Sequence, residues 1–177
     1  EISAIIPFAW FGVGFFDDYP VSPYGDSSSG DQVFSLLQKM TGDTAEAQAG
    51  VNLLASHYGA DGPESHVPML WAVATGGSLG TYLPAQTECP AGYYGYPCFR
   101  PGAIQIIIIM TDAPFHNGPG NYSAYGSDVT PEPPEYNYAV AALDTIHAKV
   151  LPVYSGSSTD IGMTHCESIA LDTGAAI

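Results

Sequence analysis

An uninterrupted apolar run near the middle of the chain restricts the possible folds more than any other feature. Residues 106 to 116 read IIIIMTDAPFH, so four isoleucines and a methionine lead directly into Thr111, Asp112 and a proline. A strand this apolar is expected to be buried on both faces, as in a parallel sheet with helices on either side. Ligand sites of open parallel sheets lie just beyond the carboxyl ends of the strands. Asp112 is therefore expected at a ligand-binding edge.

The rest of the pattern alternates strands with helices, which predicts one layered α/β domain over residues 1–177. We expect strands at 9–18, 33–40, 103–110 and 150–154, and helices at about 45–54, 65–75, 138–147 and 164–172. Thr41 or Asp43 is expected to cap the first helix. The stretch SPYGDSSSGD predicts a hairpin-like connection between the first two strands. The segment EISAIIP reads as the tail of a helix, and LDTGAAI stops where a further strand is expected, so the domain is expected to be incomplete.

The charge balance is strongly acidic and limits the classes of partner. The chain carries 18 acidic residues against three basic ones, a net charge of -15. Such a surface repels phosphate backbones and anionic headgroups, so we expect neither nucleic-acid binding nor direct membrane contact. Divalent cations and basic partners are favoured. The alternative is that the acidity only keeps a secreted or salt-adapted protein in solution.

Two cysteines, Cys89 and Cys98, bracket the segment CPAGYYGYPC, which is rich in glycine, proline and tyrosine. Such a segment has little packing of its own, so a disulfide between the two would help to order it. A disulfide indicates an oxidising compartment, hence an extracellular or cell-surface location. The alternative is two free thiols in a cytosolic loop. Cys166 is left over, either as a buried helix thiol or paired outside this chain.

Acidic residues lie in three loops at the ends of predicted elements. Asp18 ends the first strand, Asp61 and Glu64 precede the helix at 65–75, and Asp112 follows the isoleucine strand. Carboxylates gathered at one edge of a sheet repel one another unless a cation lies among them. A ligand set made of oxygens suits Mg²⁺, Mn²⁺ or Ca²⁺ better than zinc. The alternative for each acid is a helix cap or a solvated loop charge.

The histidines do not suggest zinc, because His57, His66 and His116 match no zinc-binding spacing. An isolated loop histidine is usually polar surface, and we expect that here. A serine hydrolase is also disfavoured, because the GxSxG match at 76–80, GGSLG, follows an expected helix rather than the strand that a nucleophile elbow requires.

Three segments together resemble a known family. The first segment, FGVGFFDDYPVSPYG, is similar to a family strand that ends in an acid followed by Pro-Val-Ser-Pro-Tyr. The second, GADGPESHVPMLWAV, is similar to an Asp-x-Pro-Glu loop that leads into a helix. The third, IIIIMTDAPFH, is similar to an apolar strand that ends in Thr-Asp-Ala, with a histidine shortly after. In this order they resemble the von Willebrand factor A family, and within it the integrin β-subunit I-like domain and its prokaryotic cell-surface relatives. The resemblance implies a Rossmann-like α/β fold with a central, mostly parallel sheet flanked by helices.

The resemblance also implies a metal-ion-dependent adhesion site, where Mg²⁺ (or Mn²⁺) keeps one coordination position open for an acidic group of a partner. Glu64 and Asp112 match two ligands of that site. A neighbouring Ca²⁺ site shares the glutamate, and Asp18, Asp61 and the carbonyl of Pro63 match its other ligands. The family usually has asparagine where this chain has Gly59, so this second site is expected to be weaker or completed by water.

One element of the family is missing from the chain. No DxSxS sequence occurs, and the strand that carries it in the family lies between those expected at 9–18 and 103–110. Its absence would leave two central edges bare, which a stable sheet does not tolerate. We expect either that the native protein continues upstream of Glu1 or that another chain supplies the strand.

The sequence thus favours a binding module rather than an enzyme. The hypothesis is an extracellular adhesion domain that coordinates an acidic side chain of a protein partner through the cation, with the loops at 84–100 and 114–137 setting specificity. The alternative is a structural subunit or stalk domain of a cell-surface assembly, in contact with copies of itself, with a degenerate or purely structural metal site. A metal-dependent hydrolase is disfavoured because no general base or nucleophile stands beside the carboxylates.

Overall fold

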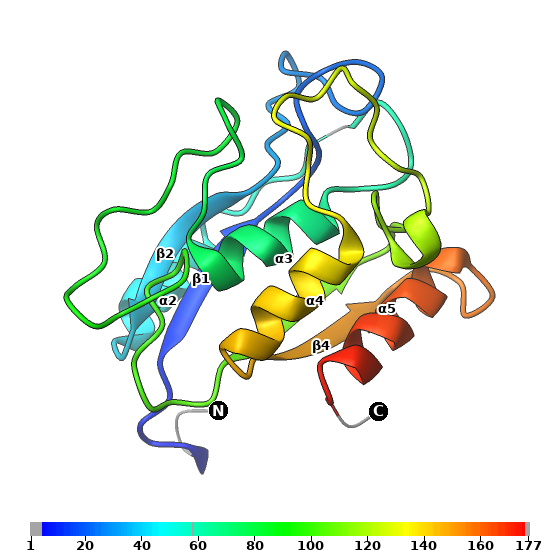
Figure 1. Ribbon diagram of the computed structural model, residues 1–177. Coiled ribbons are helices and arrows are strands. Elements are labelled where there is room, and N and C mark those ends of the chain that lie inside the picture. Colours follow the sequence, from blue (N-terminus) through cyan, green and yellow to red (C-terminus); the bar gives the residue numbers. More distant parts are fainter. Residues whose placement is uncertain (1–4, 58, 176–177) are drawn as a thin grey trace.

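The computed structural model describes residues 5–57 and 59–175 as a small α/β structure with two separate two-stranded sheets (Figure 1). The strands are β1 (Phe11–Phe15), β2 (Ser35–Thr41), β3 (Ile106–Thr111) and β4 (Lys149–Tyr154). The helices are α2 (Thr44–Val51), α3 (His66–Thr75), α4 (Tyr136–Thr145), α5 (Ile161–Asp172) and a short 3₁₀ helix, η1 (Pro119–Asn121). β1 and β2 pair antiparallel, whereas β3 and β4 pair parallel.

These elements lie close to where the sequence predicts them. All four expected strands and all four expected helices form, with ends that differ by up to three residues. Asp43 rather than Thr41 caps α2, since its carboxylate accepts a hydrogen bond from the Ala45 amide at 2.8 Å. The antiparallel pairing of β1 and β2 confirms the expected hairpin. The helix tail expected at 1–7 begins outside the described residues, and so does the end of LDTGAAI at 176–177.

Helix α3 connects the two sheets. Directly before it, the Ser65 hydroxyl donates to the Val33 carbonyl at 2.7 Å, near the start of β2. At its first residue, the His66 ring lies 2.9 Å from the Thr111 hydroxyl at the end of β3 and stacks on Phe115. Nearly every side chain of α3 is buried. A helix that is apolar on all sides belongs in the middle of a core, so α3 is a central element of this one; it packs mainly on α4, and its first turn contacts residues beside both sheets.

The β3–β4 pair is buried on one face only. Ile109 and Val150 are 2% and 0% exposed on the face that packs against the helices, and Figure 1 shows α4 and α5 on one side of β4. On the other face, half or more of the surface of three β3 side chains is exposed, those of Ile106, Ile108 and Met110. Leu151 and Val153 of β4, directly opposite Ile108 and Met110, are exposed too. The expectation that this strand is buried on both faces is therefore wrong for the described residues, because none of them forms an element over the outer face.

Both sheets have unpaired edges within the described part of the chain. β1 pairs only with β2, and β3 pairs only with β4, so no hydrogen-bonded ladder joins the two sheets. The architecture agrees with the predicted α/β class and includes one parallel pair. The bare edges of β1 and β3 are those expected when no strand lies between them.

The cysteines behave as the sequence suggests. Cys89 and Cys98 form a disulfide, which confirms the predicted bond, and Cys166 is a free, buried thiol on α5. Burial raises the pKa of the Cys166 thiol to about 11, so it stays protonated and unreactive near neutral pH. Among the described helices, none has both the length and the apolar character that a membrane crossing requires.

The one-sided burial of β3 is testable with two neighbouring isoleucines. We expect Ile109→Ala to lower the free energy of unfolding by about 2–5 kcal/mol, since it opens a cavity in the core. Ile108→Ala, at a side chain that is 52% exposed, should cost less than about 1 kcal/mol. Urea unfolding of both variants measures the difference. Equal losses would mean that the outer face of β3 is covered in solution.

Candidate metal centre

Three loops meet at the amino-terminal end of α3. The Glu64 amide donates to the Pro114 carbonyl and the His116 amide donates to the Glu64 carbonyl, both at 2.9 Å. On the other side, the Ser65 amide donates to the carbonyl of Asp17, which follows β1, also at 2.9 Å. Backbone hydrogen bonds thus fix the segments after β1 and β3 against the loop before α3. Side chains from all three loops are brought together at this junction.

The closest group there consists of Asp18, Asp61 and His116. The Nε2 atom of His116 lies 3.2 Å from Oδ2 of Asp18 and 3.1 Å from Oδ2 of Asp61. One potential ligand atom of each residue lies within 4.8 Å of the other two. The side chains of Asp18 and His116 are each 1% exposed, whereas that of Asp61 is 30% exposed. The group is therefore buried, with Asp61 on its solvent side.

His116 lies between the two carboxylates in a setting that favours its charged form. Its Nδ1 lies 2.5 Å from the Ser123 carbonyl, so both ring nitrogens face oxygen acceptors, and only the doubly protonated ring donates to both sides. Burial by itself would lower the pKa of His116. The close contact with Asp18, the hydrogen bond to the Ser123 carbonyl and the charges of Asp18 and Asp61 outweigh burial and raise the pKa above its ordinary value.

Asp18 is held from one side and left open on the other. Its Oδ1 accepts hydrogen bonds from the Tyr19 amide at 2.6 Å and from the Tyr125 hydroxyl at 2.5 Å. Its Oδ2 faces His116 but accepts no hydrogen bond from any described residue. The fixed Oδ1 orients the carboxylate, and the second oxygen is left available to a ligand.

Glu64 adds a second buried carboxyl oxygen without a partner. Its Oε2 is inaccessible to solvent and forms no hydrogen bond within the described chain. Burial, followed by the negative charges of Asp18, Asp17, Asp31 and Asp61, raises the pKa of Glu64 to about 8. An ionised carboxylate in this position is costly unless a positive charge compensates it. Near neutral pH the site therefore holds either a proton or a cation.

The residues predicted from the sequence are brought together only in part. Asp18 and Asp61 meet, and Glu64 is close enough for their charges to raise its pKa. Pro63 lies in the same loop, and its carbonyl accepts no hydrogen bond from a described residue. Asp112 is exposed and lies outside the group of three, so its role as a ligand beside Glu64 stays a prediction. Gly59 borders the site, since a Cβ at this position would lie 3.4 Å from Oε1 of Glu64.

His116 is the site residue that the sequence reading missed. The expectation that the loop histidines are polar surface is wrong for His66 and His116, which are 0% and 1% exposed. Its position in the sequence could have indicated a site residue, since His116 stands four residues after Asp112 and just past the apolar strand. Sequence spacing alone did not show that the loop turns this ring back toward Asp18.

The raised pKa of Glu64 predicts how stability depends on pH. The folded carboxyl binds its proton up to about pH 8, whereas the unfolded one loses it near its ordinary pKa of 4.5. The folded state thus binds more protons between these values, so this contribution to stability is lost as pH rises. In EDTA we expect wild type to lose more stability between pH 5 and 8 than Glu64→Gln, by urea unfolding at several pH values. Parallel pH profiles would contradict the assignment.

Comparison with known proteins places the chain in no family. No family model matches it, and no curated protein matches it. The likeness to the von Willebrand factor A family therefore rests on the three sequence segments, and what it implies for function is taken up below as a proposal.

Proposed function

We propose that this chain is an extracellular recognition domain that binds divalent cations and uses them to hold an acidic group of a protein partner. The observation that carries the proposal is the group of acidic side chains at the junction of three loops, in which Oε2 of Glu64 is buried without a hydrogen bond and Oδ2 of Asp18 faces only His116. Buried polar atoms are nearly always bonded, so a buried carboxylate oxygen without a partner beside two further acids favours a bound cation. The disulfide agrees with an extracellular location.

The first cation in this proposal is Ca²⁺, held by Asp18, Asp61, Glu64 and the Pro63 carbonyl. Several carboxylates and a carbonyl are the oxygen ligands that Ca²⁺ prefers. Binding would replace the positive charge that His116 supplies to the two aspartates. His116 also offers a nitrogen, which Mn²⁺ and Zn²⁺ accept more readily than Ca²⁺, so a metal series is part of the test.

The second cation is Mg²⁺ (or Mn²⁺) at Glu64 and Asp112, with an open position for a carboxylate of the partner. Asp112 is exposed at the end of β3, which suits a site that must reach another protein. The loops at 84–100 and 114–137 would contact that protein and set specificity. Only coordination bonds change in this mechanism, so the proposed activity is binding rather than catalysis.

The Ca²⁺ site is tested by calorimetric titration of wild type and Asp18→Asn, because the variant removes one negative charge but little volume. We expect wild type to bind Ca²⁺ and the variant to bind about tenfold more weakly or worse. At about 100 times the dissociation constant, Ca²⁺ should stabilise wild type by about 2.7 kcal/mol. Asp144→Asn, at an exposed acid on α4, is the matched control and should behave as wild type. Equal Ca²⁺ affinity in all three proteins would refute this site.

The open coordination position is tested with Mn²⁺, a paramagnetic ion. Water bound to Mn²⁺ exchanges with bulk water and increases the relaxation rate of the bulk-water protons. We expect Mn²⁺ bound to wild type in the presence of Ca²⁺ to enhance this relaxation, and acetate to reduce the enhancement by displacing water. Asp112→Asn should lose the Mn²⁺ signal while retaining Ca²⁺ binding. An unchanged Mn²⁺ signal in this variant would remove Asp112 from the site and with it the adhesion mechanism.

A structural role in an assembly is the second candidate, favoured by the exposed apolar face of β3 and β4. Ile106, Ile108 and Met110, with Leu151 and Val153, form an uncharged surface of the kind that contacts other chains. In that case the cation only stiffens the loops, and contact between copies carries the function. Sedimentation velocity distinguishes the two, since self-association that survives EDTA and is lost in Met110→Lys would favour the structural role.

A further inference from the structure

A cleft of about 500 Å³ runs along the outer edge of β2, and none of the proposed metal ligands lines it. Its lining includes Phe34 and Leu36 from the β2 side, and Tyr82, Ala85 and Tyr96 from the segment that follows α3. Phe34 and Tyr96 are buried and pack edge to face. The cleft therefore has a preformed aromatic pair at its floor, between a strand edge and a loop, within a lining that is more polar than apolar.

One wall of the cleft is backbone with free hydrogen-bonding groups. β2 is the edge strand of its sheet, so only one side of it pairs with β1. Beyond that ladder, the Met40 amide donates to the Pro97 carbonyl at 2.9 Å. Nearer the start of the strand, no backbone group of residues 35–37 bonds to a described residue outside the ladder. An unpaired edge of this kind is a template for another extended chain.

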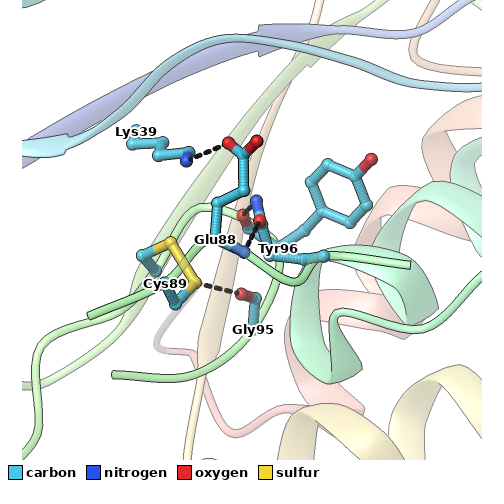
Figure 2. The surroundings of a disulfide bond; sticks show 7 residues. Lys39, Glu88, Cys89, Gly95 and Tyr96 are labelled. Atoms are coloured by element: carbon cyan, nitrogen blue, oxygen red, sulfur yellow. Dashed lines mark hydrogen bonds and ion pairs between the residues drawn. A yellow bond between two sulfur atoms is a disulfide. The ribbon is translucent and has the colours of Figure 1, made fainter. Parts of the chain in front are cut away.

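The opposite wall is held in place by its own bonds. The Gln86 amide donates to the Gly76 carbonyl at 2.9 Å, and the Gln86 side chain donates to the Tyr96 carbonyl at 2.8 Å. The Tyr96 hydroxyl donates to the Pro84 carbonyl at 3.1 Å, and the disulfide closes the segment beyond it. Figure 2 shows Glu88 reaching from this wall to Lys39 of β2, where the two form an ion pair at 2.9 Å. The wall is thus fixed at a distance from the strand.

We propose that this cleft binds an extended segment of a basic partner protein, which adds a strand to the free edge of β2. Only another extended backbone supplies a matching row of amides and carbonyls, and alternate side chains of that strand would face Phe34 and Tyr96. This site is separate from the metal centre and does not depend on the proposed function.

The charge of the molecule favours a basic occupant. The chain has a net charge of -15, and the one basic residue lining the cleft, Lys39, is neutralised by Glu88. A positively charged segment is therefore attracted to this surface, whereas an acidic segment or a second copy of this acidic chain is repelled.

The test uses a fluorescent peptide of about ten residues, in which valine alternates with threonine and a lysine stands at each end. Its control has the same sequence with alternate backbone amides N-methylated, which removes the donors but keeps the charge. Binding is measured by fluorescence anisotropy at about 0.15 M salt, with and without EDTA. We expect saturable binding of the first peptide, unaffected by EDTA, and at least about tenfold weaker binding of the methylated one.

Two matched variants locate the binding to the cleft. Ala85→Trp places a bulky ring at an exposed position that lines the cleft, and it should weaken binding about tenfold or more. Ala91→Trp adds the same ring at an exposed position in the disulfide segment outside the cleft, and binding should not change. Thermal unfolding of both variants verifies that they fold.

Three outcomes would overturn the proposal. They are no binding of the unmethylated peptide, equal binding of the two peptides, and binding that Ala85→Trp leaves intact. A homodimer in sedimentation velocity that Ala85→Trp abolishes would also overturn it, since the occupant would then be a second copy. Because the assay is unaffected by chelation, its failure is distinguishable from failure of the metal site.

Discussion

Mutual repulsion among buried carboxylates at the amino-terminal end of α3 is the constraint on which the rest of the structure depends. Asp17, Asp18, Asp31 and Asp61 all act on Glu64, and the pKa of Glu64 rises to about 8 as burial removes it from water. The same place joins the loops after β1 and β3 to α3 through backbone hydrogen bonds. The junction that joins these loops is therefore also a place where acidic side chains crowd around a buried carboxyl group. His116 relieves part of that repulsion, and a cation would relieve more.

The position of α3 explains how two small, separate sheets share one core. Its side chains are buried on nearly all sides, and Ser65 and His66 anchor its first turn to residues of both sheets. The helices cover one face of β3 and β4 and leave the other to solvent, so the isoleucine strand has two different environments. The metal centre lies at the amino-terminal end of α3, whereas the cleft follows the edge of β2, and the two proposed sites share no residue.

Much of the local structure was predictable because it depends on near neighbours in the chain. The strands and helices follow from the periodicity of apolar residues and from capping residues such as Asp43 at the start of α2. The Cys89–Cys98 disulfide follows from two cysteines that flank a glycine- and proline-rich segment. Of the site, Asp18 and Asp61 were predictable because one follows a strand and the other precedes a helix at the same expected edge of the sheet. The burial of His116 was not, because it depends on the path of a loop that the isoleucine pattern does not constrain.

The sequence by itself determined which segments form strands and helices, which cysteines pair and which acids lie at the loop ends, since these depend on side-chain type and short spacing. Only the tertiary structure decided that His116 lies between Asp18 and Asp61 and that Oε2 of Glu64 is left without a partner. It also decided that Ile108 faces solvent while Ile109 is buried, and that a cleft lies beside β2. These features depend on which distant segments pack together and on which surfaces no segment covers. Neither can be predicted from a local sequence pattern.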